Sequence, residues 1–186
     1  MPDITPQLVA QLRAMTNAGM MDCKKALVET AGDLEAAVDL LRKRGVATAA
    51  KKSVREAREG AIAQHILPGS RLGVLVEVNC ETDFVAKNDL FRAFCDQVAR
   101  TLAENPAADL EPLRTDAVSR IRENIRIARH QRYELSGNGL IAAYIHTGAK
   151  VGVLVEVGAG REATVATEDF KQLVKDITLQ IAAASP

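Results

Sequence analysis

An internal repeat constrains the fold of this chain more than any other feature of its sequence. Each copy begins with a similar stretch, GAIAQHI at 60–66 and GLIAAYI at 139–145, and each then contains GVLVEV, at 73–78 and at 152–157. Both matches have the same offset of 79 residues. The offset also relates Gly69 to Gly148, Phe91 to Phe170 and Val98 to Ile177. Self-similarity in a single register indicates duplication of a structural unit.

Each copy has the pattern of two strands followed by an amphipathic helix. Two apolar runs flank a turn that contains Gly69 or Gly148, and a loop then leads into residues with helical spacing. Between the copies, 116–123 predicts a helix, and 124–134 alternates well enough to predict a third strand. We therefore expect an antiparallel-sheet-plus-helix core with a first copy at 60–138 and a shortened second copy at 139–186.

Three short helices are predicted before the repeat. Thr5-Pro6 is a helix-start signal, Gly32-Asp33 breaks and caps the chain, and Gly45 lies where a helix end favours a left-handed residue. We expect a three-helix docking module at 1–45, because so small a bundle has little core of its own, and an exposed basic helical linker at 46–59. The expected fold class is α+β, with this module followed by the duplicated core.

Composition and charge argue against several classes of function. The chain has 186 residues, of which 47% are hydrophobic and 26% charged, as in ordinary globular proteins. Its 24 basic and 24 acidic residues cancel, which argues against direct nucleic-acid binding. Apolar runs are far shorter than the roughly 20 residues that span a membrane, and the first residues show no signal-peptide pattern. We expect a cytoplasmic protein that recognises partners by shape.

The sequence contains no strong catalytic or cofactor-binding motif. It has neither a GxxxxGK[ST] nor a GxGxxG phosphate cradle, its three cysteines form no CxxC, and its histidines have no partner at helical spacing. Packing roles are expected for Cys23, Cys80, Cys95 and His65. We expect no metal, no cofactor and no enzymatic activity. An acid/base site assembled from carboxylates of both copies stays open, because spacing alone does not show whether side chains converge.

The two copies differ most in the segment after their second strand. The first copy has NCETDFVAKND at 79–89, whereas the second has GAGREAT at 158–164, so that Phe84 corresponds to Ala163. A phenylalanine required by a shared core would not be expected to become alanine. Two explanations stay open: Phe84 is exposed for a task of the first copy, or it fills a gap that helix packing creates only there.

Several motifs resemble the bacterial translation elongation factor Ts family. They are TNAGMMDCKKAL at 16–27 followed by Lys51-Lys52, GVLVEVNCETDFVAKND at 73–89, ENIRIAR at 123–129 and HTGAKVG at 146–152. The amino-terminal helices by themselves are of a ubiquitin-associated type that occurs in many proteins. The resemblance covers nearly the whole chain. It implies a short form, because longer members continue beyond the helix matched by 169–184 into a helical-hairpin arm and a further strand.

The resemblance implies a guanine nucleotide exchange factor for elongation factor Tu. The loop that pushes towards the magnesium site of the partner would be Thr82, Asp83, Phe84 and Val85, with the phenylalanine wedged between partner helices. The docking residues would be Arg13, Met20, Met21, Lys24 and His146. Met20 and Met21 could also be core residues, but adjacent side chains on one helix do not both point inward, so at least one is expected to be exposed.

Two other classes of function stay open beside the exchange factor. One is an adaptor that binds another protein through its helical module while the duplicated core is purely structural. The other is an enzyme with a site across the two copies. If the second copy lacks a third strand, its open sheet edge could also pair with another chain and form a homodimer.

Overall fold

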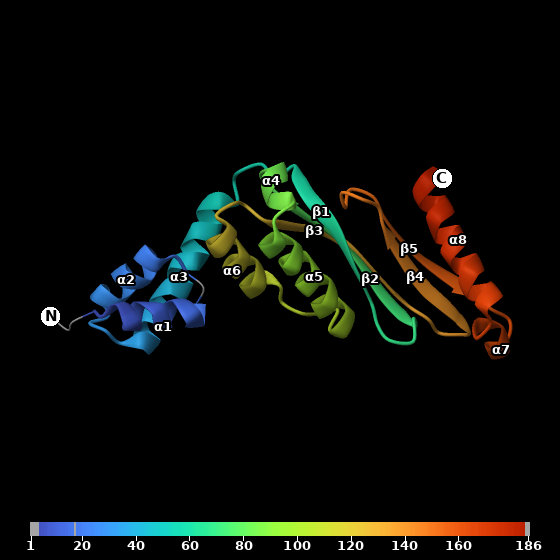
Figure 1. Ribbon diagram of the computed structural model, residues 1–186, viewed down its shortest axis with the longest axis horizontal. Helices are drawn as coiled ribbons and strands as arrows, with labels where there is room; N and C mark the ends of the chain where they lie inside the picture. Colours follow the sequence, from blue (N-terminus) through green and yellow to red (C-terminus); the bar gives the residue numbers. More distant parts are fainter. Residues whose placement is uncertain (1–3, 17, 185–186) are drawn as a thin grey trace. The chain divides into compact units, whose positions relative to one another are not determined.

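The chain is organised in two compact units. The computed structural model describes residues 4–16 and 18–184 (Figure 1). The first unit combines Met1–Glu56 with Glu111–Ile125, and the second combines Ala57–Leu110 with Arg126–Pro186. Within the described ranges, no helix is both long enough and apolar enough to cross a membrane.

The first unit contains four helices in its described residues. They are α1 (Pro6–Thr16), α2 (Met20–Glu29), α3 (Leu34–Lys52) and α6 (Glu111–Ile121). The start signals predicted from the sequence are confirmed: the Leu8 amide donates to the Thr5 hydroxyl, and the Ala36 amide donates to the Asp33 carboxylate. Six buried residues form the core of the three-helix module, namely Val9, Leu12, Cys23, Ala26, Leu27 and Ala37.

The helix end predicted at Gly45 is wrong. Helix α3 runs through this residue to Lys52, and its second half packs against α6. Gly45 is buried there, and a Cβ at this position would lie 3.7 Å from Cγ2 of Thr115. Burial against α6 outweighs the helix propensity of glycine, which is about 1 kcal/mol poorer than that of alanine. The segment 46–59 is mostly exposed, as expected of a linker, but it is helical only to Lys52, and Ala49 is buried.

The second unit contains the duplicated core. Its first copy consists of β1 (Glu59–Ile66), β2 (Leu72–Cys80), α4 (Asp83–Ala86), α5 (Asp89–Glu104) and β3 (Arg126–Glu134). The second copy consists of β4 (Gly139–Ile145), β5 (Gly152–Gly158), α7 (Glu162–Val165) and α8 (Glu168–Ala184). The strands form one antiparallel sheet of order β1-β2-β3 and one antiparallel pair, β4-β5. These elements confirm the α+β class.

The two copies keep the same local geometry at the offset of 79 residues. Ile62 lies opposite Glu77 in the first copy, and their counterparts Ile141 and Glu156 lie opposite each other in the second. The turns also match, because φ is 87° at Gly69 and 90° at Gly148, and 53° at Ser70 and 56° at Ala149. Left-handed backbone favours glycine and strains other residues, so this agreement shows that both turns adopt one conformation.

The two sheets of the second unit pack face to face, with α5 and α8 on the outside (Figure 1). A Cβ on Gly73 would lie 2.7 Å from Ile141 and 3.0 Å from Leu154. A Cβ on Gly152 would lie 2.6 Å from Ile62 and 3.2 Å from Leu75, which are the residues that correspond to Ile141 and Leu154. The contact is therefore pseudo-symmetric.

Backbone hydrogen bonds between the copies follow the same pseudo-symmetry. The Ile62 amide donates to the Ala149 carbonyl at 2.8 Å, and the Ile141 amide donates to the Ser70 carbonyl at 2.7 Å. Each turn is thus held against the first strand of the other copy.

The second copy is less completely covered than the first. Strand β3 has no counterpart beside β5 in the described residues. Val151 and Leu173 are 40% and 51% exposed, whereas the corresponding Leu72 and Phe94 of the first copy are 8% and 7% exposed. The structure thus agrees with the open sheet edge expected for the second copy.

Candidate partner-binding site

The predicted loop at Thr82–Val85 forms a corner between strand β2 and helix α5, and most of it belongs to the short helix α4. Thr82 caps α4 by accepting a hydrogen bond from the Val85 amide at 3.3 Å. Asn88 then caps α5 by accepting a hydrogen bond from the Leu90 amide at 2.8 Å. Side-chain caps satisfy amides that have no partner within a helix, so the first turns of α4 and α5 are each fixed by a local hydrogen bond.

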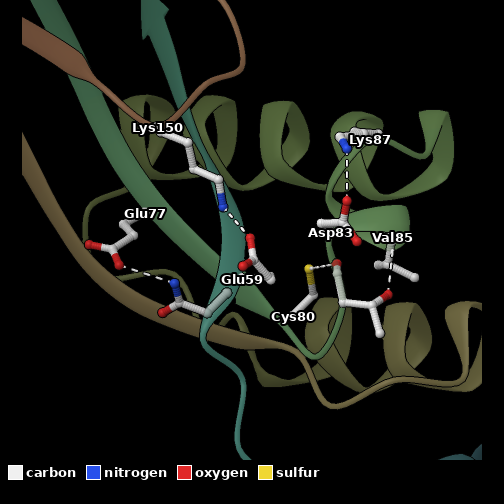
Figure 2. A network of polar contacts seen from close by, with 9 residues as sticks. Glu59, Glu77, Cys80, Asp83, Val85, Lys87 and Lys150 are labelled. Atoms are coloured by element: carbon white, nitrogen blue, oxygen red, sulfur yellow. Dashed lines mark hydrogen bonds and ion pairs between the residues drawn. The ribbon is translucent and has the colours of Figure 1, made fainter.

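Buried residues anchor the base of this corner. Cys80 is fully buried at the end of β2, and its thiol donates to the Thr82 carbonyl at 3.2 Å (Figure 2). Ala86, the last residue of α4, is also buried. The corner is therefore held from beneath while its outer residues face solvent.

Phe84 is 82% exposed at the tip of the corner. The other phenylalanines, Phe91, Phe94 and Phe170, are buried. The explanation in which Phe84 fills a packing gap of the first copy is therefore wrong, because the ring covers no core. A large exposed ring on an anchored backbone is a feature that scaffold packing does not require, and such rings are typical of contact sites.

Asp83 carries a charge next to this ring. Its carboxylate accepts a hydrogen bond from the Lys87 ammonium at 2.8 Å, and this bond holds the pKa of Asp83 below its ordinary value (Figure 2). This ion pair joins Asp83, in the first turn of α4, to Lys87, which follows the last residue of the helix. The exposed Phe84 ring is therefore next in sequence to an acidic residue whose charge is balanced by Lys87.

The docking residues predicted in the helical module lie on its surface. Met20 and Met21 are 58% and 62% exposed, so both methionines point away from the module core. Arg13 and Lys24 are exposed as well. Met15 and Val28, which the sequence analysis did not select, are further exposed apolar residues of the module. Met15 lies three residues after the buried Leu12, so helical spacing placed it on the core side and gave no signal of its exposure, whereas Val28 lies outside the spacing of the buried positions of α2.

His146 is exposed in the turn between β4 and β5. Its Nδ1 lies 3.1 Å from the Tyr144 hydroxyl. The same turn is bound to β1, because Lys150 forms an ion pair of 2.6 Å with Glu59 (Figure 2). Glu59 lies opposite Cys80 in the sheet, and Cys80 anchors the Thr82–Val85 corner. Within the second unit, the structure thus links the His146 turn and the corner through adjacent residues of β1 and β2.

Comparison with known proteins decides the family. The family model described as Elongation factor TS matches residues 81–186. This chain belongs to the elongation factor Ts family. A relative named Elongation factor Ts from Symbiobacterium thermophilum is 48% identical over 98% of this chain and 62% of its own length. Relatives of the same name from Nostoc sp. and Alkalilimnicola ehrlichii are 43% and 47% identical, each over 98% of this chain and 63% of their own length.

The chain thus spans less than two thirds of the length of these elongation factor Ts relatives. The family assignment rests on the segment that contains the corner, the third strand and the whole second copy. The relatives extend the similarity to the helical module, since their matches cover 98% of this chain.

The corresponding segment of the second copy lacks the features of the corner. Helix α7 has the same length as α4, but Arg161 at its N-cap makes no side-chain hydrogen bond to it. Ala163 stands at the position of Phe84, and no residue of α7 is buried. The capped, anchored corner with an exposed ring therefore belongs to the first copy alone, which favours a one-sided contact over a symmetric site.

The cysteines are placed as buried packing residues. The side chains of Cys23, Cys80 and Cys95 are buried, and none of the three forms a disulfide bond within the described residues. Burial raises the pKa of the Cys95 thiol to about 12, which disfavours the reactive thiolate. Among the described residues, no group of histidine, cysteine or carboxylate side chains has the arrangement of a metal site.

A groove of about 430 Å³ lies between β4 and α8. Apolar residues of β4 and α8 form most of its wall, and its titratable lining residues are Tyr144, Lys171 and Lys175. The described lining residues include no carboxylate that could act as a general acid or base with them. The groove therefore gives no support to an acid/base site shared by the two copies.

Proposed function

We propose that this chain is a guanine nucleotide exchange factor that promotes GDP release from elongation factor Tu. The observation that carries the proposal is the 82% exposure of Phe84 on a capped and anchored corner. Membership of the elongation factor Ts family supports the choice of partner. Cytoplasmic localisation is part of the same proposal.

The mechanism needs no covalent chemistry in the exchange factor. A GTPase holds GDP largely through a magnesium ion and backbone amides around the phosphates. Thr82, Asp83, Phe84 and Val85 would enter beside the elements that position these ligands, and the Phe84 ring would keep them apart. Displacement of the metal ligands weakens the grip on GDP without competition for the nucleotide site itself. The chain therefore acts without catalytic residues or a cofactor of its own.

Rigidity of the corner favours this mechanism. An aromatic ring has few rotatable bonds, so it loses little conformational entropy on binding, and the Thr82 and Asn88 caps restrict the backbone on both sides. Thermodynamic linkage then requires that the chain bind nucleotide-free partner more tightly than GDP-bound partner, by the same factor by which it weakens GDP.

Docking would involve a second set of residues. Arg13, Met20, Met21 and Lys24 are all exposed on the helical module, and exposed methionines adapt well to a protein surface. His146 would add a contact from the second unit. The proposed partner is a protein, and the balanced charge of the chain gives no support to direct nucleic-acid binding.

An adaptor function is the second candidate, and the exposed apolar side chains of Met20, Met21 and Val28 favour it. Such an adaptor would bind a partner through its module and would have no need for the exposed Phe84. The two candidates predict different results in one assay. An exchange factor accelerates the loss of fluorescent GDP from elongation factor Tu at substoichiometric amounts, whereas an adaptor binds stoichiometrically without acceleration.

The Phe84→Ala variant tests the wedge. Burial of a phenylalanine contributes about 1.5–3 kcal/mol, so its loss at the rate-determining contact should reduce the acceleration of GDP release about 10- to 100-fold. Binding of the module should be largely retained. Val54→Ala is a matched control, because Val54 is 86% exposed in the first unit and outside both candidate surfaces. A release rate for Phe84→Ala equal to that of the unmodified chain would refute the wedge.

A further inference from the structure

Leu90 is a second large apolar side chain exposed next to the Phe84 corner. It is 59% exposed in the first turn of α5, whereas its neighbour Phe91 is fully buried. The Leu90 amide donates to the Asn88 side chain, and this cap begins the helix that follows the corner. Both apolar side chains are thus carried by capped helices that only Lys87 and Asn88 separate.

The duplication provides an internal reference for this residue. In the second copy, Leu90 corresponds to Asp169 in the first turn of α8, just as Phe84 corresponds to Ala163. The shared fold therefore requires no apolar side chain at either position. Val151 and Leu173 are exposed for a different reason, because their counterparts Leu72 and Phe94 are apolar and buried in the first copy.

Local physics favours an acidic residue over leucine at this position. The first turn of a helix presents unpaired amides and the positive end of the helix dipole, so a carboxylate there is stabilising. An exposed leucine gives up that contribution and leaves apolar surface in water. Neither cost has a compensating contact within the described residues of the core, since the side chain of Leu90 faces solvent.

We propose that Leu90 is a partner-contacting residue that forms, with Phe84, one apolar surface against the nucleotide-binding protein. The proposal rests on the proposed exchange function and extends its contact site beyond the Thr82–Val85 corner. The surface is continuous along the chain with the corner, and Lys87, which forms an ion pair with Asp83, lies between its two apolar members in sequence. An apolar centre with polar side chains beside it is the usual composition of a binding hot spot.

The two members of the surface have separable roles. Phe84 lies at the tip of the corner and would act on the metal-binding elements of the partner, which affects the maximal rate of GDP release. Leu90 lies on the longer helix behind the corner and would contribute to binding in both the initial and the nucleotide-free complex. A contact of that kind changes the half-saturating partner concentration and leaves the maximal rate nearly unchanged.

The Leu90→Asp variant tests this role, because it introduces the residue that the second copy already has. The thermal midpoint should stay unchanged or rise, since an acidic residue suits the first turn of α5. In steady-state exchange with GDP-bound elongation factor Tu as the varied substrate, the half-saturating concentration should rise at least about tenfold, and the maximal rate should change less than about twofold. Leu90→Ala, which adds no charge, should shift the half-saturating concentration in the same direction.

Leu173→Asp is the matched control. Leu173 is 51% exposed on α8 of the second copy, so the substitution places the same charge at a similarly exposed leucine. We expect wild-type exchange kinetics for this variant. A half-saturating concentration for Leu90→Asp equal to that of the wild type, or an equal increase in Leu173→Asp, would overturn the proposal while leaving the exchange function intact. Failure of the wild-type chain to accelerate GDP release would overturn both.

Discussion

At the scale of single residues, Gly73 and Gly152 decide how closely the two copies pack. A Cβ at either position would lie between 2.6 and 3.2 Å from isoleucine and leucine side chains of the other copy, which is closer than ordinary contact distance. The apolar spacing of β2 and β5 already indicated buried strands, but it did not show which residue faces the other copy. The pseudo-symmetric contacts explain why the same residue type stands at both positions.

Gly73→Ala should therefore destabilise the second unit. The added methyl group would lie 2.5 Å from Cδ1 of Ile66 and 2.7 Å from Ile141, and overpacking of this kind costs about 1–3 kcal/mol. Gly160→Ala is the control, because a Cβ at Gly160 would meet no atom within 4 Å. Urea unfolding should give a lower midpoint for Gly73→Ala only. Equal midpoints for the two variants would contradict the prediction that the added methyl group at Gly73 overpacks the contact between the two sheets.

At the scale of elements, the two hairpin turns have equivalent places but different neighbours. Lys150 in the second turn pairs with Glu59, next to the strand end that carries the Thr82–Val85 corner. Arg71, the corresponding residue of the first turn, donates instead to the carbonyls of Leu135 and Gly137 in the connection between the copies. The duplication thus places a basic residue in each turn that binds another segment of the second unit. Only the Lys150–Glu59 ion pair adjoins the candidate contact site.

Lys150→Gln should weaken exchange more than Arg71→Gln. Exposed ion pairs contribute about 0–1 kcal/mol, so loss of the Lys150 contact should raise the half-saturating concentration of elongation factor Tu by up to about fivefold. The Arg71 variant should have wild-type exchange kinetics. A double-mutant cycle of Lys150→Gln with His146→Ala would measure whether the Lys150–Glu59 ion pair affects exchange by positioning His146. Fully additive effects of the two substitutions would contradict this coupling between Lys150 and His146.

At the scale of the whole chain, the second copy is incomplete where the first is covered. Strand β3 pairs with the outer edge of β2, while the corresponding edge of β5 has no strand beside it in the described ranges. Val151 and Leu173 are correspondingly more exposed than their counterparts. An unpaired strand edge next to apolar side chains is a template for association with another chain.

We therefore expect the 186-residue chain to self-associate through β5 at high concentration. Val151→Lys places a charge at the start of this strand, where the present valine is 40% exposed, and should shift the equilibrium towards monomer without loss of fold. Sedimentation velocity over a range of concentrations measures the shift. A wild-type chain that sediments as a monomer at all concentrations up to about 100 μM would contradict the expectation.

Most of the fold could be predicted from the sequence. The repeat predicted two copies of strand, strand and helix, the alternation at 124–134 predicted β3, and the start signals at Thr5 and Asp33 predicted α1 and α3. The end of α3 was missed because the evidence lies elsewhere in the chain. Only the packing of α6, whose first residue is Glu111, explains why a helix continues through Gly45.

The candidate site likewise has features that could be predicted from the sequence and features that only the structure revealed. By itself, the sequence determined the local patterns: the duplication, the helix caps and the family motifs, which depend on residues close together in the chain. Only the tertiary structure decided that Phe84 and Leu90 are exposed, that both Met20 and Met21 face solvent and that Lys150 reaches Glu59. Exposure and long-range contacts depend on which surfaces other elements cover. That information is a property of the packed chain and not of any local segment.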